Sequence, residues 1–431
     1  MRLNYGKTFL LGFGFFGVSV IWGVYNAFVP VFLAGKFHLS PVFVGFFMTL
    51  DNIAALLIQP PVGAWSDKLR TPIGRRMPFI LVGAPIGAAA FGFIPVASVL
   101  PLFVAGTSTL LLSMALWRTP VVALMPDITP SPFRSQANGI VNFMGGVGAI
   151  ISFLVGARLY EMNPAYPFWM GSALVVGATL LVFIFIKEPK TYEAGEAQPG
   201  MLASLREVMQ DEDRSALRLL AAIFFWFLGY TAIEAFFNLY AINHLGITEA
   251  DGTRLLGQLS LIFVIFALPA GYVGGKVGRR TTIVSGIVLM SVVMLVMFFL
   301  PVKTLLISLA PLPLIGVRLA PETPMVLPVI GVLLMIAGAA WALININSLP
   351  MVVDMTGAAR IGTYTGLYYL FSTLSAIVGP NSNGWIIQLT GRNYNAIMIV
   401  APVFMAVALA LMLGVTRGEA VTQAAAVAGT D

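Results

Sequence analysis

The sequence has no cysteine, two histidines and few charged residues. Of its 431 residues, 10% are charged and 58% are hydrophobic, whereas soluble domains carry about 25% charged residues. The absence of cysteine excludes disulfide bonds, thiolate metal sites and a cysteine nucleophile. His38 and His244 are too few for a histidine-rich metal site. The solvent of this chain is therefore mostly lipid.

Enzyme motifs are missing as well. The chain has no GxxxxGK[ST] phosphate-binding loop, so it lacks a direct ATP motor. No Ser/His/Asp set is placed for hydrolysis, and we expect neither an enzyme nor a cofactor. The net charge of +6 does not indicate nucleic acid, because the positive charges follow membrane topology.

Apolar runs of about 20 residues predict transmembrane helices. We expect an all-α membrane protein with twelve such helices. The predicted spans are 8–34, 42–65, 78–98, 100–125, 137–159, 166–187, 219–243, 255–275, 282–300, 326–350, 362–386 and 393–415. The first run is too long for a signal peptide, so we expect it to be retained. Segment 301–325 is broken by five prolines and is expected to be a long loop with a re-entrant or interfacial piece.

The placement of lysine and arginine predicts the orientation of the chain. With the N-terminus inside, 17 of the 24 basic residues lie on the inner side, six lie on the outer side, and Arg118 lies within a span. Both termini are therefore expected in the cytoplasm. Short loops and a retained first span are typical of a bacterial inner (plasma) membrane protein, and we expect a monomer.

The chain divides into two sets of six spans. We expect an N-terminal bundle (1–187), a cytoplasmic linker with a short amphipathic helix (188–218), a C-terminal bundle (219–417) and a disordered tail (418–431). The linker region is the longest polar stretch of the sequence, which is why we place the division there.

Short motifs recur in both halves. PVGAWSDK is followed by GRR at Gly74–Arg76, and PAGYVGGK is followed by GRR at Gly278–Arg280. An aspartate and a glycine twelve residues apart, with an arginine between them, occur at Asp127–Gly139 and again at Asp354–Gly366. Such repeats between two six-span halves are typical of transporters that bind a substrate between the halves near the bilayer centre.

These loops resemble the major facilitator superfamily, whose loop signature is matched by Gly63, Asp67 and Gly74–Arg76. The longer form QPxxGxxSDK…GRRxPFI, together with RTPVVALMPD (Arg118–Asp127), resembles the sucrose-transporter and solute-carrier-45-like branch. More distantly, it is similar to the glycoside–pentoside–hexuronide cation symporters. The resemblance covers nearly the whole chain and implies proton symport of a sugar or glycoside by two pseudo-symmetric bundles. Gly275 stands at the position of Asp67 in the second copy, so the aspartate's role is not extended to it.

Three charged residues lie deep in predicted spans. Asp51 is about 15 Å into its span, and Glu234 and Arg118 lie at a similar depth. A charge in lipid costs a few kcal/mol or more unless it is paired or hydrated, so we expect all three to face a shared cavity. We hypothesise that Glu234 or Asp51 carries the coupled proton and that Arg118 tunes it or holds the sugar. The alternative is that Asp51 and Arg118 form a permanent salt bridge between two spans.

Polar and aromatic side chains recur at helical spacing on several spans, as in the i, i+4, i+8 series of Tyr230, Glu234 and Asn238. Amides and hydroxyls suit the hydroxyl groups of a sugar, and flat aromatic rings suit its C–H faces. The alternative for each amide is a hydrogen bond to a neighbouring helix, worth about 0.6 kcal/mol. The predicted substrate-binding residues are Trp22, Tyr25, Asn26, Gln59, Asn142, Tyr230, Asn238, Trp341, Asn345 and Tyr368.

Charged residues also gather at the inner ends of the spans. A salt-bridge network there would close a cytoplasmic gate and break when the site opens inward. The alternative is that the basic residues only anchor the topology. The predicted gate residues are Asp67, Arg75, Arg76, Asp127, Arg134, Asp354 and Arg360.

Two further functions stay open on the sequence. A proton-coupled efflux antiporter for an amphipathic small molecule would also use an apolar cavity with an isolated carboxylate. A non-transporting membrane receptor or assembly factor would keep the bundle but would not need carboxylates in mid-membrane. The presence of Asp51 and Glu234 therefore favours transport of a small molecule.

Overall fold

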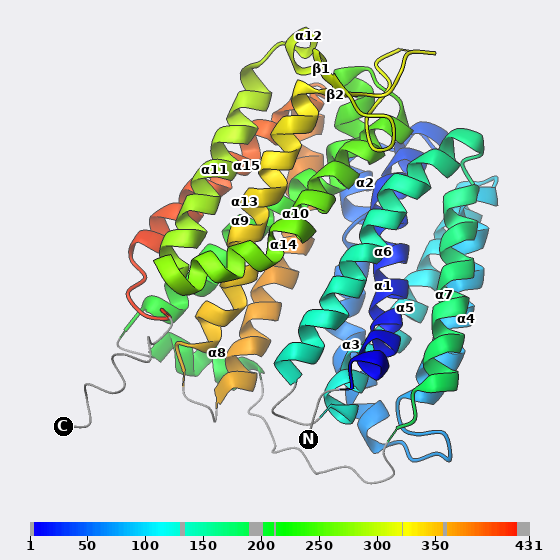
Figure 1. Cartoon of the computed structure of the whole chain (residues 1–431), viewed down its shortest axis with the longest axis vertical. Helices are drawn as coiled ribbons and strands as arrows, with labels where there is room; N and C mark the ends of the chain where they lie inside the picture. The colour runs from blue at the N-terminus through cyan, green and yellow to red at the C-terminus, as the bar shows by residue number, and fades with distance from the viewer. Residues whose placement is uncertain are drawn as a thin grey trace.

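The computed structural model describes residues 4–129, 134–188, 201–210, 213–320, 322–356 and 360–419. In this part of the chain the protein is an almost entirely helical bundle (Figure 1). Helix α1 begins and helix α15 ends at one end of the bundle, which we call the termini end. A small hairpin lies at the opposite end, which we call the hairpin end.

The first half, which we call the N-half (residues 4–188), packs its helices around α1. Several helices begin with proline in their first turn, where its fixed φ suits a helix and its missing N–H is not needed. The helices are α1 (Tyr5–Val31), α2 (Pro41–Phe47), α3 (Leu50–Lys68), α4 (Met77–Phe93), α5 (Leu100–Ile128), α6 (Arg134–Met162) and α7 (Tyr166–Phe185).

The second half, which we call the C-half (residues 213–419), follows a short helix, α8 (Met201–Gln210), in the linker region. Its helices are α9 (Ser215–Tyr240), α10 (Glu249–Val277), α11 (Arg279–Phe299), α12 (Val302–Leu305), α13 (Val329–Val353), α14 (Ile361–Leu389) and α15 (Ile397–Leu413). Thr248 caps α10 by accepting a hydrogen bond from the backbone N–H of Asp251 over 3.2 Å.

Eleven helical segments of the described chain are long and apolar enough to cross a membrane. α14 is not among them, but it is 29 residues long and packs against α9 of its own half and α2 of the other. With α14, the segments match the twelve predicted spans. The protein is therefore a multi-pass membrane protein.

Segment 301–328 is more regular than a long loop. After α12 it forms two strands, β1 (Ser308–Pro311) and β2 (Val326–Pro328), which pair antiparallel with Ser308 opposite Pro328. The strands lie at the hairpin end of the bundle, beyond the helix ends (Figure 1). The described residues of this segment therefore lie at the end of the bundle, which favours the interfacial alternative over a re-entrant piece.

The second predicted span is broken, but not at its prolines. α2 ends at Phe47 and α3 begins at Leu50, while Pro60 and Pro61 lie inside α3. The hydroxyl of Thr49 donates to the carbonyl of Phe46 over 2.7 Å, which satisfies one of the groups freed at the break. The break places Asp51 in the first turn of α3, where the positive end of the helix dipole favours a carboxylate.

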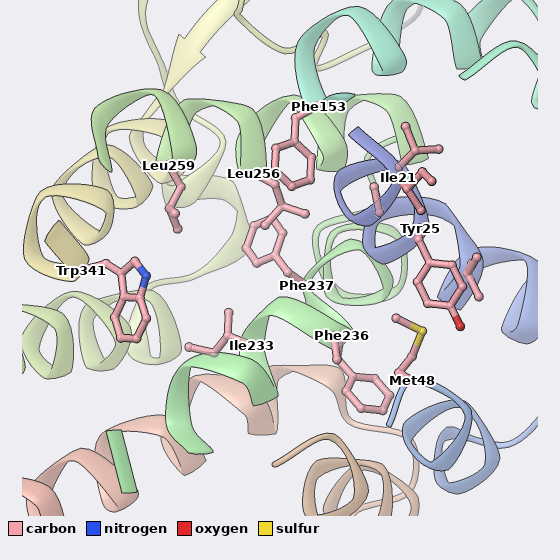
Figure 2. Close-up of a cluster of buried hydrophobic side chains, with 14 of the residues drawn as sticks. Ile21, Tyr25, Met48, Phe153, Ile233, Phe236, Phe237, Leu256, Leu259 and Trp341 are labelled. Carbon is pink, nitrogen blue, oxygen red and sulfur yellow. The ribbon is translucent and has the colours of Figure 1, made fainter. Parts of the chain in front are cut away.

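The two halves meet along a continuous apolar core. Figure 2 shows Phe153 of the N-half beside Leu256 of the C-half, and Tyr25 and Met48 of the N-half near Phe236 of the C-half. Glycines allow close approach at this interface: a Cβ added at Gly257 of α10 would lie 3.2 Å from Phe153 Cβ of α6. This apolar core holds the halves together on the hairpin-end side.

Candidate functional site

A cavity of about 310 Å³ lies between the two halves, bordered by α1, α6, α9, α10 and α13. Six of the predicted site residues line it: Trp22, Asn26, Asn142, Tyr230, Glu234 and Trp341. The sequence analysis missed Ser19 and Ser260, which add hydroxyl groups, and Phe15 and Phe263, which add apolar surface. Ser19 stands three residues before Trp22, a helical spacing that would have placed both side chains on one face.

Glu234 is the carboxylate of this cavity. Its Oε1 accepts a hydrogen bond from Asn26 Nδ2 over 3.4 Å, and this contact joins α9 of the C-half to α1 of the N-half. Glu234 also interacts electrostatically with Asp51. In the described part of the chain no ion pair joins Glu234 to a basic residue. A carboxylate with one long neutral hydrogen bond is available to a proton or a ligand.

Aromatic rings form the walls of the cavity. Tyr230 and Trp341 are stacked, with ring centroids 3.8 Å apart and planes at 1°. Trp22 contacts Tyr25 edge to face at 5.6 Å, and the buried Nε1 of Trp22 has no hydrogen-bond partner. Buried donors are usually satisfied, so this N–H is suited to a ligand that carries an acceptor.

Asp51 and Arg118 interact without forming the salt bridge that was the alternative to a role in proton coupling. They interact electrostatically, but no ion pair within 4.0 Å joins these two described residues. Asp51 Oδ1 instead accepts from Asn52 Nδ2 over 2.9 Å. Arg118 is half-buried, has no hydrogen-bond partner among the described side chains, and interacts electrostatically with Tyr369 of α14. Of the three deep charges expected to share one cavity, Glu234 lines it, whereas Asp51 and Arg118 are not among its lining residues.

The other predicted substrate-binding residues lie outside the lining of this cavity. Asn238 Nδ2 donates to Ala27 O over 2.8 Å and to Thr253 Oγ1 over 3.1 Å, so this amide joins helices. The hydroxyl of Tyr368 is 3.1 Å from Ser348 Oγ in the C-half core. Tyr25 is buried behind Trp22, and Gln59 and Asn345 are half-buried on α3 and α13.

The predicted gate residues of the N-half form one ion-pair cluster at the termini end. Asp127 Oδ1 lies 2.6 Å from Arg75 Nη2, and Asp127 Oδ2 lies 2.9 Å from Arg76 Nε. Arg76 also pairs with Asp67. The carboxylate of Glu188, just after α7, accepts from the backbone N–H groups of Arg75, Arg76 and Met77. Glu188 therefore caps the start of α4, where an anion is favoured.

The C-half repeats this arrangement in part. Arg279 pairs with Asp354 and donates to Pro350 O over 2.9 Å. Glu419 accepts from the backbone N–H groups of Arg279 at 2.6 Å and Arg280 at 3.0 Å, so it caps α11 as Glu188 caps α4. The guanidinium of Arg280 donates to backbone carbonyls at the end of α15, and Gly275 stands where the N-half has Asp67.

These ion pairs link helices of the same half. None of the ion pairs described at the termini end joins the N-half to the C-half. Arg360 is exposed just before α14, and the side chain of Arg134 lies outside the described residues. In this conformation the described ion pairs of Asp67, Asp127 and Asp354 link parts of one half.

Sequence reasoning missed the two glutamate caps and a charged cluster at the hairpin end. Glu188 and Glu419 each follow the last span of a half, a repeat that was readable in the sequence. At the hairpin end, Glu161 of α6 pairs with Arg254 of α10 over 2.7 Å, a pairing that no sequence pattern indicated. Within the described ranges, no three His, Cys, Asp or Glu side chains come together as a metal site.

Known proteins share the sequence pattern and the fold. Multidrug resistance protein 1 of Bacillus subtilis is 24% identical over 221 residues, covering 51% of this chain and 54% of that protein. A sucrose transport protein of Arabidopsis thaliana is 28% identical over 163 residues, covering 33% of this chain and 27% of that protein. The chain thus matches about half of the first relative and about a quarter of the second.

Solved structures resemble the fold over a longer range. A bacterial homologue of the human lysosomal transporter Spinster, solved in an inward-facing and occupied conformation, is 14% identical with a TM-score of 0.72. The likeness covers 96% of this chain and 97% of the other. The Major Facilitator Superfamily profile matches residues 11–380 and 260–429. This protein belongs to the Major Facilitator Superfamily, a family of membrane transporters.

Proposed function

We propose that this protein is a secondary active transporter that carries a sugar or glycoside together with a proton. The observation that carries the proposal is the cavity between the halves, where Glu234 faces stacked aromatic rings and amide groups. A substrate bound there would contact both halves. Relative movement of the halves would then expose the site to each side in turn.

The lining suits a polyhydroxylated ligand. Asn26, Ser19, Ser260 and Tyr230 supply hydrogen-bonding groups, and the indole rings of Trp22 and Trp341 supply flat apolar faces. Ligand sites combine mostly apolar walls with a few placed polar groups in this way. The partial similarity to a sucrose transport protein supports the same class of substrate.

Proton coupling would rest on Glu234, with Asp51 as the second candidate. A protonated Glu234 needs no buried counter-ion, whereas its ionised form would be costly in a dry cavity. Arg118, near Asp51 and without a hydrogen-bond partner among the described side chains, would hold a substrate hydroxyl or tune Asp51. In the cell we place the protein in the plasma membrane, as a monomer with both termini in the cytoplasm.

A proton-coupled efflux antiporter is the second candidate function. Phe15, Phe263 and Val264 give the cavity an apolar side, and half of the chain is similar to Multidrug resistance protein 1. An amphipathic small molecule would fit such a lining. The direction of proton movement separates this function from symport.

Transport by purified protein in proteoliposomes tests these functions. Symport predicts that a labelled disaccharide or glycoside accumulates when the outside is acidic, with protons entering alongside it. Antiport predicts opposite proton movement with an amphipathic cation, and a receptor predicts no flux at all. Nucleosides belong in the same panel, because a stacked aromatic pair also suits a base. If none of these compounds is transported in either direction, transport at this site is contradicted.

A further inference from the structure

Glu161, in the last turn of α6, joins the two halves at the hairpin end. Its Oε1 lies 2.7 Å from Arg254 Nη2 and 2.9 Å from Arg318 Nη1. Arg254 belongs to α10 and Arg318 to the segment between β1 and β2, so both arginines come from the C-half. One carboxylate of the N-half thus binds two cations of the C-half.

Arg254 is buried, with 1% of its surface exposed. Its second anionic partner, Asp251, lies 2.7 Å away on the same helix. Asp251 Oδ1 also accepts from the backbone N–H of Arg318 over 3.0 Å, which fixes the hairpin segment onto α10. A buried guanidinium depends on its ionic partners, and one of the two belongs to the other half. Separation of the halves at this end would remove Glu161 from Arg254.

The cluster borders a surface hollow of about 870 Å³ at the hairpin end, which is lined from both halves. Beneath it, Tyr160 stacks on Phe28 at 4.3 Å with planes at 4°, and the apolar residues of Figure 2 fill the space between the halves. The charged cluster therefore borders this hollow with Arg254 and Asp251 buried, and apolar side chains lie between the halves.

Other polar contacts between the halves also lie on this side of the bundle. Asn238 donates to Ala27 O, and Asn381 Nδ2 donates to Thr49 Oγ1 over 3.2 Å. At the termini end, by contrast, the described ion pairs stay within one half. The described ion pairs that join the two halves therefore lie at the hairpin end.

We propose that Glu161 is the residue that latches the hairpin end shut. It acts through Arg254 of α10 and through Arg318 of the segment between β1 and β2. The latch would break each time the cavity opens toward the hairpin end and re-form when it opens toward the termini end. The proposal rests on the alternating movement of the proposed function. It assigns a role to residues that the sequence did not single out.

The test measures distances between the halves by pulsed electron resonance in lipid nanodiscs. The chain has no cysteine, so introduced cysteines carry the only spin labels. One pair, Val99→Cys with Leu389→Cys, reports on the hairpin end, and a second, Ile73→Cys with Val277→Cys, reports on the termini end. All four positions are exposed in the structure.

Glu161→Gln is expected to raise the ratio of hairpin-end-open to closed molecules by at least roughly tenfold, because a shared inter-half charge is lost. The hairpin-end pair should then gain longer distances while the termini-end pair gains shorter ones. Arg318→Gln, in the segment between β1 and β2, should shift the distances of both label pairs in the same directions. It serves as the second variant if Glu161→Gln fails to fold.

Arg158→Gln is the matched control. Arg158 also pairs with Glu161, over 3.0 Å, but lies on the same helix, so its loss should leave both distance distributions unchanged. Unchanged distributions in both Glu161→Gln and Arg318→Gln would overturn the latch. So would an equal shift in Arg158→Gln. The distances need no substrate, so the latch can fail while sugar transport holds, and sugar transport can fail while the latch holds.

Discussion

The side-chain amide of Asn26 donates a hydrogen bond to Glu234 across the interface of the two halves, over 3.4 Å. The bond is long for an N–H···O contact and therefore weak. It lies at the wall of the cavity, where movement of the halves would break it. Glu234 would then exchange a neutral partner for water, substrate or a proton, which is the property that coupling requires.

Trp22→Phe is expected to raise the KM for the transported substrate about tenfold, because the ligand loses a buried hydrogen-bond donor. A smaller aromatic ring remains, so the fold should be retained, and the control variant accounts for the lost ring volume. Initial rates of uptake in proteoliposomes measure the effect. Trp226→Phe is the control, since Trp226 Nε1 also lacks a partner but the residue does not line the cavity. Equal KM changes in both variants would contradict a role for Trp22 in binding.

Asp127→Asn should destabilise the protein more than Asp67→Asn. Asp127 binds both Arg75 and Arg76 with 11% of its side chain exposed, whereas the side chain of Asp67 is 56% exposed. We expect a loss of about 3 kcal/mol for Asp127→Asn and below about 1 kcal/mol for Asp67→Asn. Thermal unfolding in one detergent gives the order. The reverse order would show that the network is not centred on Asp127.

Glu188→Gln should lower the stability of the N-half by about 1–2 kcal/mol, because the start of α4 loses an anionic cap. Its counterpart Glu419→Gln should act similarly on α11. Lys187→Gln, next to Glu188, is the control and should have little effect. Apparent unfolding temperatures measure all three variants. A Glu188→Gln protein as stable as the Lys187→Gln protein would mean that the cap is dispensable.

Gly274→Ala and Gly275→Ala should differ sharply although the residues are adjacent. A Cβ at Gly274 would lie 2.6 Å from Asn347 Cγ, whereas a Cβ at Gly275 has no neighbour within 4 Å. Overpacking predicts a loss of about 1–3 kcal/mol for Gly274→Ala. Gly275→Ala should be neutral or slightly stabilising. Thermal unfolding measures both variants, and equal stability would contradict the close contact of Gly274 on α10 with Asn347 on α13.

Much of the architecture was predictable because lipid imposes a strong pattern. The lengths of the apolar runs predicted the spans, and the recurring GRR motifs predicted two related halves. The break at Met48–Thr49 was not predictable, because no proline or glycine marks it and it depends on tertiary packing. Pro60 and Pro61 lie inside α3, which runs through both residues.

Depth in a span predicted part of the cavity. Glu234 and Trp341, both predicted as site residues, line the cavity, and helical periodicity relates residues on one span. Periodicity does not show which neighbouring group a polar side chain contacts. Asn238 and Tyr368 were predicted to bind substrate, whereas in the structure their polar groups contact other helices. The Glu161–Arg254 pair joins segments far apart in the chain, and a single sequence gives no signal for such a contact.

The central claim is that Glu234 couples proton movement to sugar transport. The most direct measurement compares wild-type protein with Glu234→Gln in proteoliposomes, using a labelled disaccharide or glycoside that the wild type transports. The account predicts that an inward pH gradient drives accumulation by wild-type protein. Glu234→Gln should lose that accumulation but keep exchange of labelled for unlabelled substrate. Accumulation that survives in Glu234→Gln and also in Asp51→Asn would contradict the account.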